Sequence, residues 1–315
     1  MTISTIAGLK NMRELPNPLS LFTESLTKHK TAKKTMSERI APLQKILQEK
    51  MGRLQINERA KAHAKPLEAP AVQTTKASPI SVTWARHQDE VKEAQRLRYK
   101  VFAEEMGARL KPSTEGLDVD IFDNFCEHLL VRDNETLKVI GTYRALPPHQ
   151  AKQIGCLYSD SEFDLTRLRH LRHKMVEVGR SCVHRDYRSG GVIMALWSGL
   201  GQYMKKNHYE VMLGCASVQM GDGGHYAASL AKMLSTEQHL TDIEYRVFPR
   251  LALPVEELNS SLEVEPPALI KGYVRLGAKI CGNPAWDPDF NTADFLTMLR
   301  LDDIHPRYAK HFLAD

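Results

Sequence analysis

The chain contains 315 residues, of which 42% are hydrophobic and 26% charged, and its formal net charge at pH 7 is +5. This composition is ordinary for a soluble globular protein, and the longest nearly apolar stretch, residues 192–200, is far too short to cross a bilayer. The N-terminus lacks the charged-then-apolar order of a secretory signal. The five cysteines are scattered without a CxxC spacing, so we expect a cytoplasmic protein with neither a disulfide framework nor a metal site.

The basic charge is concentrated before residue 81. Residues 1–80 hold fourteen Lys or Arg against six Glu, a local net charge of +8, which leaves −3 for residues 81–315. We therefore expect a basic N-terminal extension over 1–80 and one folded domain over 81–315. The extension is either a solvated tail or a segment that binds an acidic partner, such as anionic lipid, an acidic carrier protein or nucleic acid.

Within this extension, apolar residues recur at helical spacing from Ser37 to Leu54 with Lys and Arg between them. The pattern predicts a basic amphipathic helix, which suits a membrane surface or the protein's own core. Residues 62–80, rich in Ala, Pro and Thr, are typical of a linker.

Strands and helices are both predicted after the linker. Strands are expected over 81–85, 129–132, 138–146, 175–183, 211–215, 244–248 and 293–299, and helices over 90–105, 163–172, 194–206, 226–234, 269–279 and 306–312. Because the helices do not alternate strictly with the strands, we expect an α+β fold rather than a doubly wound sheet.

Residues 175–194 combine a strand, a polar turn and a helix start. Small residues in such a turn let the backbone approach a ligand, and the unpaired N–H groups of the first helical turn point towards it. Glu177 and Arg180 in the strand place ionisable groups beside this anion cradle. The segment therefore predicts a phosphate-binding turn next to a site for proton or charge chemistry.

The turn Tyr187-Arg188-Ser189-Gly190-Gly191-Val192 resembles the pyrophosphate-binding turn of the GNAT acyltransferase superfamily, in which Arg or Gln precedes spaced glycines. Ile193 stands where a second small residue is usual, and a plain strand-to-helix connection is the alternative. The resemblance implies a GNAT-like mixed sheet flanked by helices. It also implies that Arg188, Ser189, Gly190 and Gly191 hold the phosphate of phosphopantetheine.

Four charged motifs resemble those of the acyl-homoserine-lactone synthases, GNAT-like enzymes that take an acyl chain from acyl carrier protein. The motifs are Arg98-x-x-Val101-Phe102, Asp120-x-x-Asp123, Arg144-x-Leu146-Pro147 and Glu177-x-x-Arg180. That family usually has Trp after the glycine corresponding to Gly107, and this chain has Ala108. The departure counts against closure of a lactone ring.

A closer resemblance, to the bacterial L-ornithine Nα-acyltransferases, covers about 230 residues from near Trp84 to the C-terminus. The matching segments are 158–165, 177–183, 196–199, 214–217, 271–278 and 289–294, with Tyr308 and His311-Phe312. These enzymes make lyso-ornithine lipid from ornithine and a 3-hydroxyacyl acyl carrier protein. The resemblance implies that ornithine and acyl carrier protein are the partners, that acyl-phosphopantetheine is the co-substrate, and that no cofactor is bound.

The implied reaction, attack of an α-amine on a thioester, requires a base and a donor for the oxyanion. Glu177 would be the base, directly or through a water, or would hold the ammonium group. A structural ion pair with Arg180 is the alternative. Backbone N–H groups near residues 180–182 would bind the oxyanion. Cys182 invites an acyl-cysteine intermediate, but direct transfer is usual in GNAT enzymes, and buried Cys is commonly a core residue.

Charge sign suggests which residues bind the acceptor. Asp120 and Asp123 suit its ammonium groups, although loop aspartates are more often solvated turn residues. Arg144 or Arg180 suits its carboxylate as a bidentate clamp. Arg98 is either a further substrate-binding residue or a helix-surface charge.

Three other functions compete with this interpretation. His128-x4-Asp133 fits the HxxxxD pattern of glycerolipid acyltransferases, but the pair flanks a predicted strand, where alternation sends the two side chains to opposite faces. The second alternative is a homoserine-lactone-type or other N-acyl amino acid synthase. The third is a non-catalytic module that binds acyl carrier or nucleic acid through the basic extension. The basic charge lies outside the folded domain, so we expect no nucleic-acid partner.

If the basic extension binds anionic lipid, it would hold the enzyme at the inner membrane, where an acylated product partitions; this is a hypothesis. Deleting residues 1–60 should therefore lower the fraction of the protein that sediments with membranes, because the Lys and Arg side chains no longer meet anionic lipid. Fractionation of cells expressing the full and shortened chains measures this. Equal membrane recovery of the two would exclude the proposed anchor.

Overall fold

A computed structural model describes residues 78–108, 116–288 and 290–312 of the chain. The amphipathic helix predicted from Ser37 and residues 62–77 of the predicted linker lie outside the described residues. The first described strand begins at Ile80, and the division of the chain at residue 80 stays a prediction.

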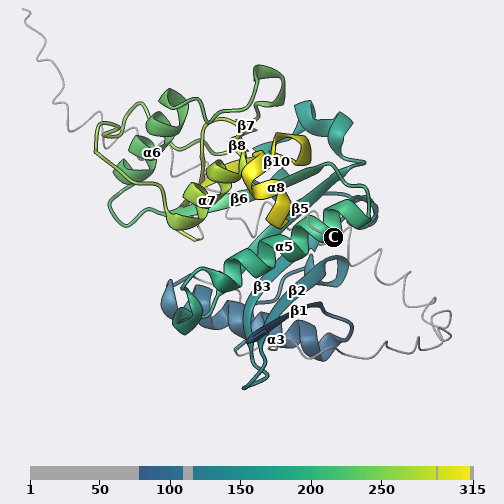
Figure 1. The fold of residues 1–315 in the computed structure, drawn as a ribbon. Coiled ribbons are helices and arrows are strands. Elements are labelled where there is room, and N and C mark those ends of the chain that lie inside the picture. The colour runs from purple at the N-terminus through teal and green to yellow at the C-terminus, as the bar shows by residue number, and fades with distance from the viewer. Residues whose placement is uncertain (1–77, 109–115, 289, 313–315) are drawn as a thin grey trace, which may run out of the picture.

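The molecule is built around an eight-stranded mixed sheet (Figure 1). Its strand order is β1-β2-β3-β5-β6-β10-β8, and β9 pairs with β10. The strands are β1 (Ile80–Trp84), β2 (Glu127–Asp133), β3 (Val139–Leu146), β5 (Met175–Val183), β6 (Val211–Gln219), β8 (Lys279–Ile280), β9 (Ala285–Asp287) and β10 (Thr292–Arg300). Among the described residues, β5 and β6 form the one parallel pair of named strands.

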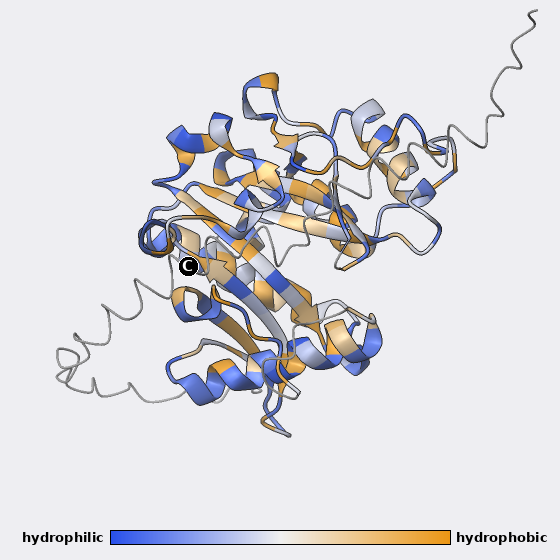
Figure 2. Cartoon of the chain, turned by 180° about the vertical axis from the view of Figure 1, so that it is seen from behind, coloured by the Kyte–Doolittle hydropathy of each residue, from blue (hydrophilic) through white to orange (hydrophobic). Residues whose placement is uncertain are grey.

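Helices pack on both faces of this sheet. They are α3 (Gln88–Tyr99), α4 (Pro148–Ile154), α5 (Gly191–Lys206), α6 (His225–Thr236), α7 (Ala268–Leu276) and α8 (Pro306–Phe312), with a π-helical turn over Lys100–Glu105. Cys182 packs with Leu97 of α3, whereas the next residue, Val183, packs with the α5 cluster. Because successive strand residues point to opposite faces, α3 and α5 cover opposite sides of the sheet (Figures 1 and 2).

The sheet separates two hydrophobic cores. Met175 and Leu213 belong to the core beneath the loops that follow β3, and their neighbours Val176 and Met212 belong to the core beneath α5. Alternating burial on both faces gives the near-continuous apolar sequence of these central strands. The predicted α+β architecture is confirmed.

Two predicted elements are wrong. The helix predicted over 163–172 is a two-residue strand, β4 (Phe163–Asp164), followed by a 3-10 helix over Thr166–Leu171, because the Asp164 carboxylate accepts the Thr166 N–H and turns the chain. The strand predicted over 244–248 is a 3-10 helix, Ile243–Tyr245, and a short strand, β7 (Phe248–Pro249), that pairs with β4. Pro249 has no N–H to donate, so the ladder does not extend beyond it.

Other boundaries shift for local reasons. Pro148 follows β3 and occupies the first turn of α4, where its missing N–H is harmless. The helix predicted over 269–279 ends at Leu276, because Gly277 adopts φ 110° and Lys279 enters β8. The remaining 3-10 helices cover Asp123–Phe125, Tyr158–Asp160, Arg185–Tyr187 and Leu301–Asp303. Within the described ranges, no helix has the length and apolarity needed to cross a bilayer.

Candidate active site

The two central parallel strands part in the middle of the sheet. β5 and β6 pair at Met175 with Val211, Val176 with Met212 and Glu177 with Leu213, and the ladder then ends although both strands continue. Gly214 lies at the point of parting, where a Cβ atom would come within 2.2 Å of the Val178 carbonyl oxygen. The sheet therefore opens immediately beyond Glu177.

A β-bulge on the other side of β5 bends the strand at the same place. Thr142 pairs with Cys182 and Arg144 with Gly179, so Arg180 and Ser181 oppose the single residue Tyr143. Arg180 adopts φ 51°, a conformation that few residues with side chains accept. Because a bulge leaves a residue outside the ladder, its backbone N–H groups can serve a ligand rather than a strand.

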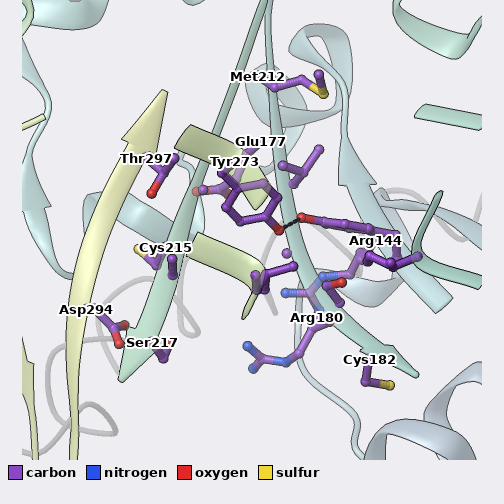
Figure 3. A pocket seen from close by; sticks show the side chains of 18 of the residues that line it. Arg144, Glu177, Arg180, Cys182, Met212, Cys215, Ser217, Tyr273, Asp294 and Thr297 are labelled. Carbon is purple, nitrogen blue, oxygen red and sulfur yellow. Dashed lines mark hydrogen bonds between the residues drawn. The ribbon is translucent and has the colours of Figure 1, made fainter. Parts of the chain in front are cut away.

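A cavity of about 540 Å³ occupies this opening (Figure 3). Its lining includes Leu146 and Leu213 from one core and Trp197 and Met212 from the other. The cavity therefore passes between β5 and β6 and joins the two faces of the sheet. Five predicted site residues line it: Glu177, Arg180, Arg144, Arg188 and Gly190.

Glu177 is the carboxylate at the point of parting. It is 6% exposed, and its Oε2 and Oε1 atoms accept the N–H groups of Tyr158 and Ser159 at 2.6 and 2.7 Å. Burial raises the pKa of this carboxyl, against the opposing effect of those hydrogen bonds and of the Arg144 charge. A carboxylate has lone pairs left after two such bonds, so Glu177 can still accept a proton or an ammonium hydrogen.

Three arginines and three aspartates form a closed ring of ion pairs beside Glu177, here called the Arg/Asp ring. Its contacts run in the order Arg98–Asp118–Arg180–Asp120–Arg144–Asp123 and back to Arg98, with N···O distances from 2.6 to 3.3 Å. Each aspartate contacts two arginines, and the three positive and three negative charges give the ring no net charge. The predicted residues Arg98, Asp120, Asp123, Arg144 and Arg180 are all brought together here.

The ring changes how two predicted aspartates are interpreted. Asp123 is buried against Arg98 and Arg144, whose charges hold the pKa of its carboxyl well below the usual range despite desolvation. The pKa of Asp120 is also lowered. Burial acts to raise it, but the charges of Arg144 and Arg180 outweigh that effect. Arginine donors already occupy the oxygens that we expected to bind substrate ammonium groups.

Arg98 is not a surface charge, because its residue is 1% exposed. It joins helix α3 to the loop that carries Asp118 and Asp123 through both salt bridges and a bond to the Asp118 carbonyl oxygen. Arg98, Asp120 and Asp123 are not among the described residues that line the cavity. They hold Arg144 and Arg180, which do line it.

The glycine turn lies at the start of α5, as predicted. Gly190 caps the helix with φ 101°, and a Cβ added at Gly190 or Gly191 would meet nothing within 4 Å, so the turn is open to a ligand. Arg188 donates from Nε to the Val183 carbonyl oxygen and from Nη2 to Glu105. Ser189 and Gly191 belong to the same turn but are not among the described lining residues.

Sequence reasoning missed an acidic strip on the far wall of the cavity. Asp287, Thr292, Asp294, Ser217 and Gln219 line it from the adjacent strands β9, β10 and β6, in cross-strand register. Burial and the like charge of Asp287 raise the pKa of Asp294 to about 6. The signal was present, since Thr292-x-Asp294 places two polar residues at a spacing of two at the start of a mostly apolar strand.

The competing motifs find no support in this geometry. His128 is buried, with Nε2 at 3.0 Å from the Asp123 carbonyl oxygen, whereas Asp133 caps the exposed β2–β3 turn. Burial raises the pKa of the Cys182 thiol to about 12, which disfavours the thiolate that an acyl-cysteine requires.

Removing one member of the buried Arg/Asp ring should destabilise the fold. Arg98→Met leaves Asp118 and Asp123 each with one arginine fewer, and breaking a buried pair in this way costs about 3–5 kcal/mol. Chemical denaturation measures the free energy of unfolding. The matched control is Lys92→Met on the exposed side of α3, whose pair with Asp89 is solvent-accessible and contributes little. Equal stability of the two variants would contradict a structural role for the ring.

A family model assigns part of the chain to a known type of domain. A family model described as an acetyltransferase (GNAT) domain matches residues 97–198, and the GNAT-like fold expected from the glycine turn is confirmed. Among solved structures, TofI in a ternary complex with an inhibitor and MTA has a TM-score of 0.44 and 14% identity, over 76% of this chain and 98% of that chain.

Curated relatives match over a longer stretch. An L-ornithine N(alpha)-acyltransferase of Brucella abortus (strain 2308) is 34% identical over 251 residues, which is 75% of this chain and 89% of the relative. One of Agrobacterium fabrum (strain C58) is 36% identical over 244 residues, which is 72% of this chain and 83% of the relative. This chain is therefore an acyltransferase and belongs to the family of the L-ornithine N(alpha)-acyltransferases.

Proposed function

We propose that the protein transfers a 3-hydroxyacyl group from the phosphopantetheine thioester of acyl carrier protein to the α-amine of L-ornithine, which gives lyso-ornithine lipid. The names of the relatives support the acceptor. The observation that carries the proposal is the cavity between β5 and β6, with the Glu177 carboxylate where the strands part.

The donor enters past the glycine turn. Gly190 and Arg188 line the cavity there, and the N–H groups of a helix N-terminus bind phosphate well. The α5 side of the cavity is apolar, lined by Ile193, Trp197, Leu200, Met212, Leu276, Leu299 and Phe312. The phosphopantetheine phosphate would lie at the turn, its thioester near the bulge, and the acyl chain against this apolar lining.

The chemistry is an acyl transfer in which a C–N bond forms and the C–S bond breaks. Glu177 takes a proton from the α-ammonium group, the free amine attacks the thioester carbon, and N–H groups of the Arg180 bulge stabilise the oxyanion. Collapse of the intermediate breaks the C–S bond and expels the pantetheine thiolate, which takes up the second proton that the nitrogen loses as the amide forms, and Glu177 then releases the first proton to solvent. A raised pKa improves Glu177 as a base near neutral pH.

The acceptor has two cationic groups and one anionic group, and the cavity offers partners for them. Among the contacts of the described residues, Asp118 and Asp120 take Nε and Nη2 of Arg180, which leaves Nη1 for a substrate carboxylate. Asp287 and Asp294 carry the charge that suits the δ-ammonium group. Figure 3 shows Asp294 and Ser217 to one side of the Arg180 guanidinium. The positive charge of Arg180 lowers the pKa of Asp294, against the larger effect of burial.

Glu177→Gln should lower kcat about 10²–10⁴-fold, because the amide cannot accept the proton. In the wild-type enzyme, kcat/KM should fall as the pH drops through the raised pKa of Glu177, and the variant should lose this limb. Turnover of 3-hydroxyacyl carrier protein with ornithine measures both, with thermal unfolding to show that the variant is folded. Wild-type turnover by the folded variant would remove Glu177 from the mechanism.

Asp294→Asn should raise KM for ornithine about 10–100-fold with a smaller effect on kcat, because a charge-assisted hydrogen bond to the δ-ammonium group is lost. Wild-type KM should also rise as the pH falls through about 6, where Asp294 becomes protonated. Asp302→Asn, an exposed aspartate beyond β10, is the control with wild-type KM. A wild-type enzyme that acylates glutamine or glycine as well as ornithine would favour the broader N-acyl amino acid synthase.

A further inference from the structure

Two tyrosine hydroxyl groups meet inside the apolar part of the cavity. Tyr143 comes from β3 and Tyr273 from α7, both line the cavity, and their hydroxyl oxygens are hydrogen-bonded to each other (Figure 3). Nothing in the reaction proposed above uses either hydroxyl. Their burial still has a cost, because a hydroxyl removed from water loses hydrogen bonds that a phenylalanine would never need.

The surroundings make this pair unusual. Tyr143 belongs to the α5-side core, Tyr273 packs against the same core, and the Trp197 ring centroid lies 5.6 Å from that of Tyr273. The acyl chain is proposed to lie in this part of the cavity. The tyrosine pair is therefore a polar point on an otherwise hydrocarbon-like wall.

The pair retains hydrogen-bonding capacity for a ligand. Each phenol has one hydrogen to donate and lone pairs to accept, and the bond between the two uses only one hydrogen. Burial raises the pKa of Tyr143 to about 12 and that of Tyr273 well above its ordinary value, so both groups stay protonated. A hydroxyl-bearing ligand can therefore donate to one oxygen and accept from the other.

The position of the pair along the cavity selects a particular atom of the donor. Tyr143 is the residue opposite the bulge at Arg180 and Ser181, where the thioester carbonyl would be held, and its hydroxyl also bonds to Ser181. The third carbon of an acyl chain is two bonds from the carbonyl carbon. A hydroxyl on that carbon would therefore follow closely after a carbonyl held at the bulge, on the stretch of the cavity where the Tyr143 hydroxyl bonds to Ser181.

We propose that the Tyr143 and Tyr273 hydroxyl groups bind the 3-hydroxyl of the donor acyl chain and make the enzyme select 3-hydroxyacyl thioesters over unsubstituted ones. This inference rests on the proposed acyl transfer. It assigns donor selection to these residues, because an unsubstituted chain would leave unused the phenol hydrogen that the Tyr143–Tyr273 bond does not consume.

The test is a competition between 3-hydroxyacyl and unsubstituted acyl carrier protein of equal chain length, with ornithine as acceptor and the full chain as enzyme. Mass spectrometry of the two products gives the selectivity ratio. The wild-type enzyme should favour the hydroxylated donor, and Tyr273→Phe should lower the ratio about tenfold, with Tyr143→Phe giving a loss of at least the same size. Turnover of the unsubstituted donor should change little in Tyr273→Phe.

The matched control is Tyr209→Phe. Tyr209 forms a comparable tyrosine pair with Tyr203, and neither is among the described residues that line the cavity. Its selectivity ratio should equal that of the wild type. An unchanged ratio in both cavity variants, or a wild-type enzyme with no preference between donors, would overturn the inference and leave acyl transfer to ornithine intact. Absence of ornithine acylation with either donor would instead refute the proposed function, and the inference with it.

Discussion

The parting of β5 and β6 is the constraint on which the site depends. Among the described residues they are the one parallel pair of named strands, and their ladder lasts only from Met175 to Glu177 on β5. A sheet opened at its centre would expose unpaired backbone groups to an apolar core. Here the bulge at Arg180 leaves backbone groups outside the ladder, and hydrophobic cores on both faces enclose the opening.

The charged residues around the opening fall into two groups. The Arg/Asp ring is neutral, so its buried charges are compensated internally, and it fixes Arg144 and Arg180 in place. Glu177 and Asp294 lie outside this ring, although the charges of Arg144 and Arg180 act on them. Their carboxylates face the cavity, and burial raises the pKa of Glu177 and Asp294. A cavity lined by these carboxylates suits a cationic substrate, which is the physical argument for an amine acceptor with a second ammonium group.

The cavity has a polar half and an apolar half, as the proposed product has a polar head group and a hydrocarbon chain. The acidic strip and Arg180 suit an amino-acid head group, and the lining under α5 suits a hydrocarbon chain. The bulge and Glu177 stand at the junction, where the new amide bond would form. The Tyr143–Tyr273 pair lies on the hydrocarbon side of the same junction, where the first polar substituent of an acyl chain would reach it.

The sequence by itself determined the central strand, the glycine turn and the helix after it, because apolar periodicity and a glycine with positive φ are local properties. It also identified five of the six members of the Arg/Asp ring, through resemblance to known motifs. It missed Asp118, because in the chain Asp118 is only one more loop aspartate. It failed at β4 and β7, where a two-residue pairing between distant segments overrides local pattern. Only the tertiary structure decided that the aspartates pair with arginines, that Asp287 and Asp294 share a wall, and that Tyr143 meets Tyr273 130 residues away. Strand register and the parting of β5 from β6 create these contacts, and neither is encoded in the spacing of residues along the chain.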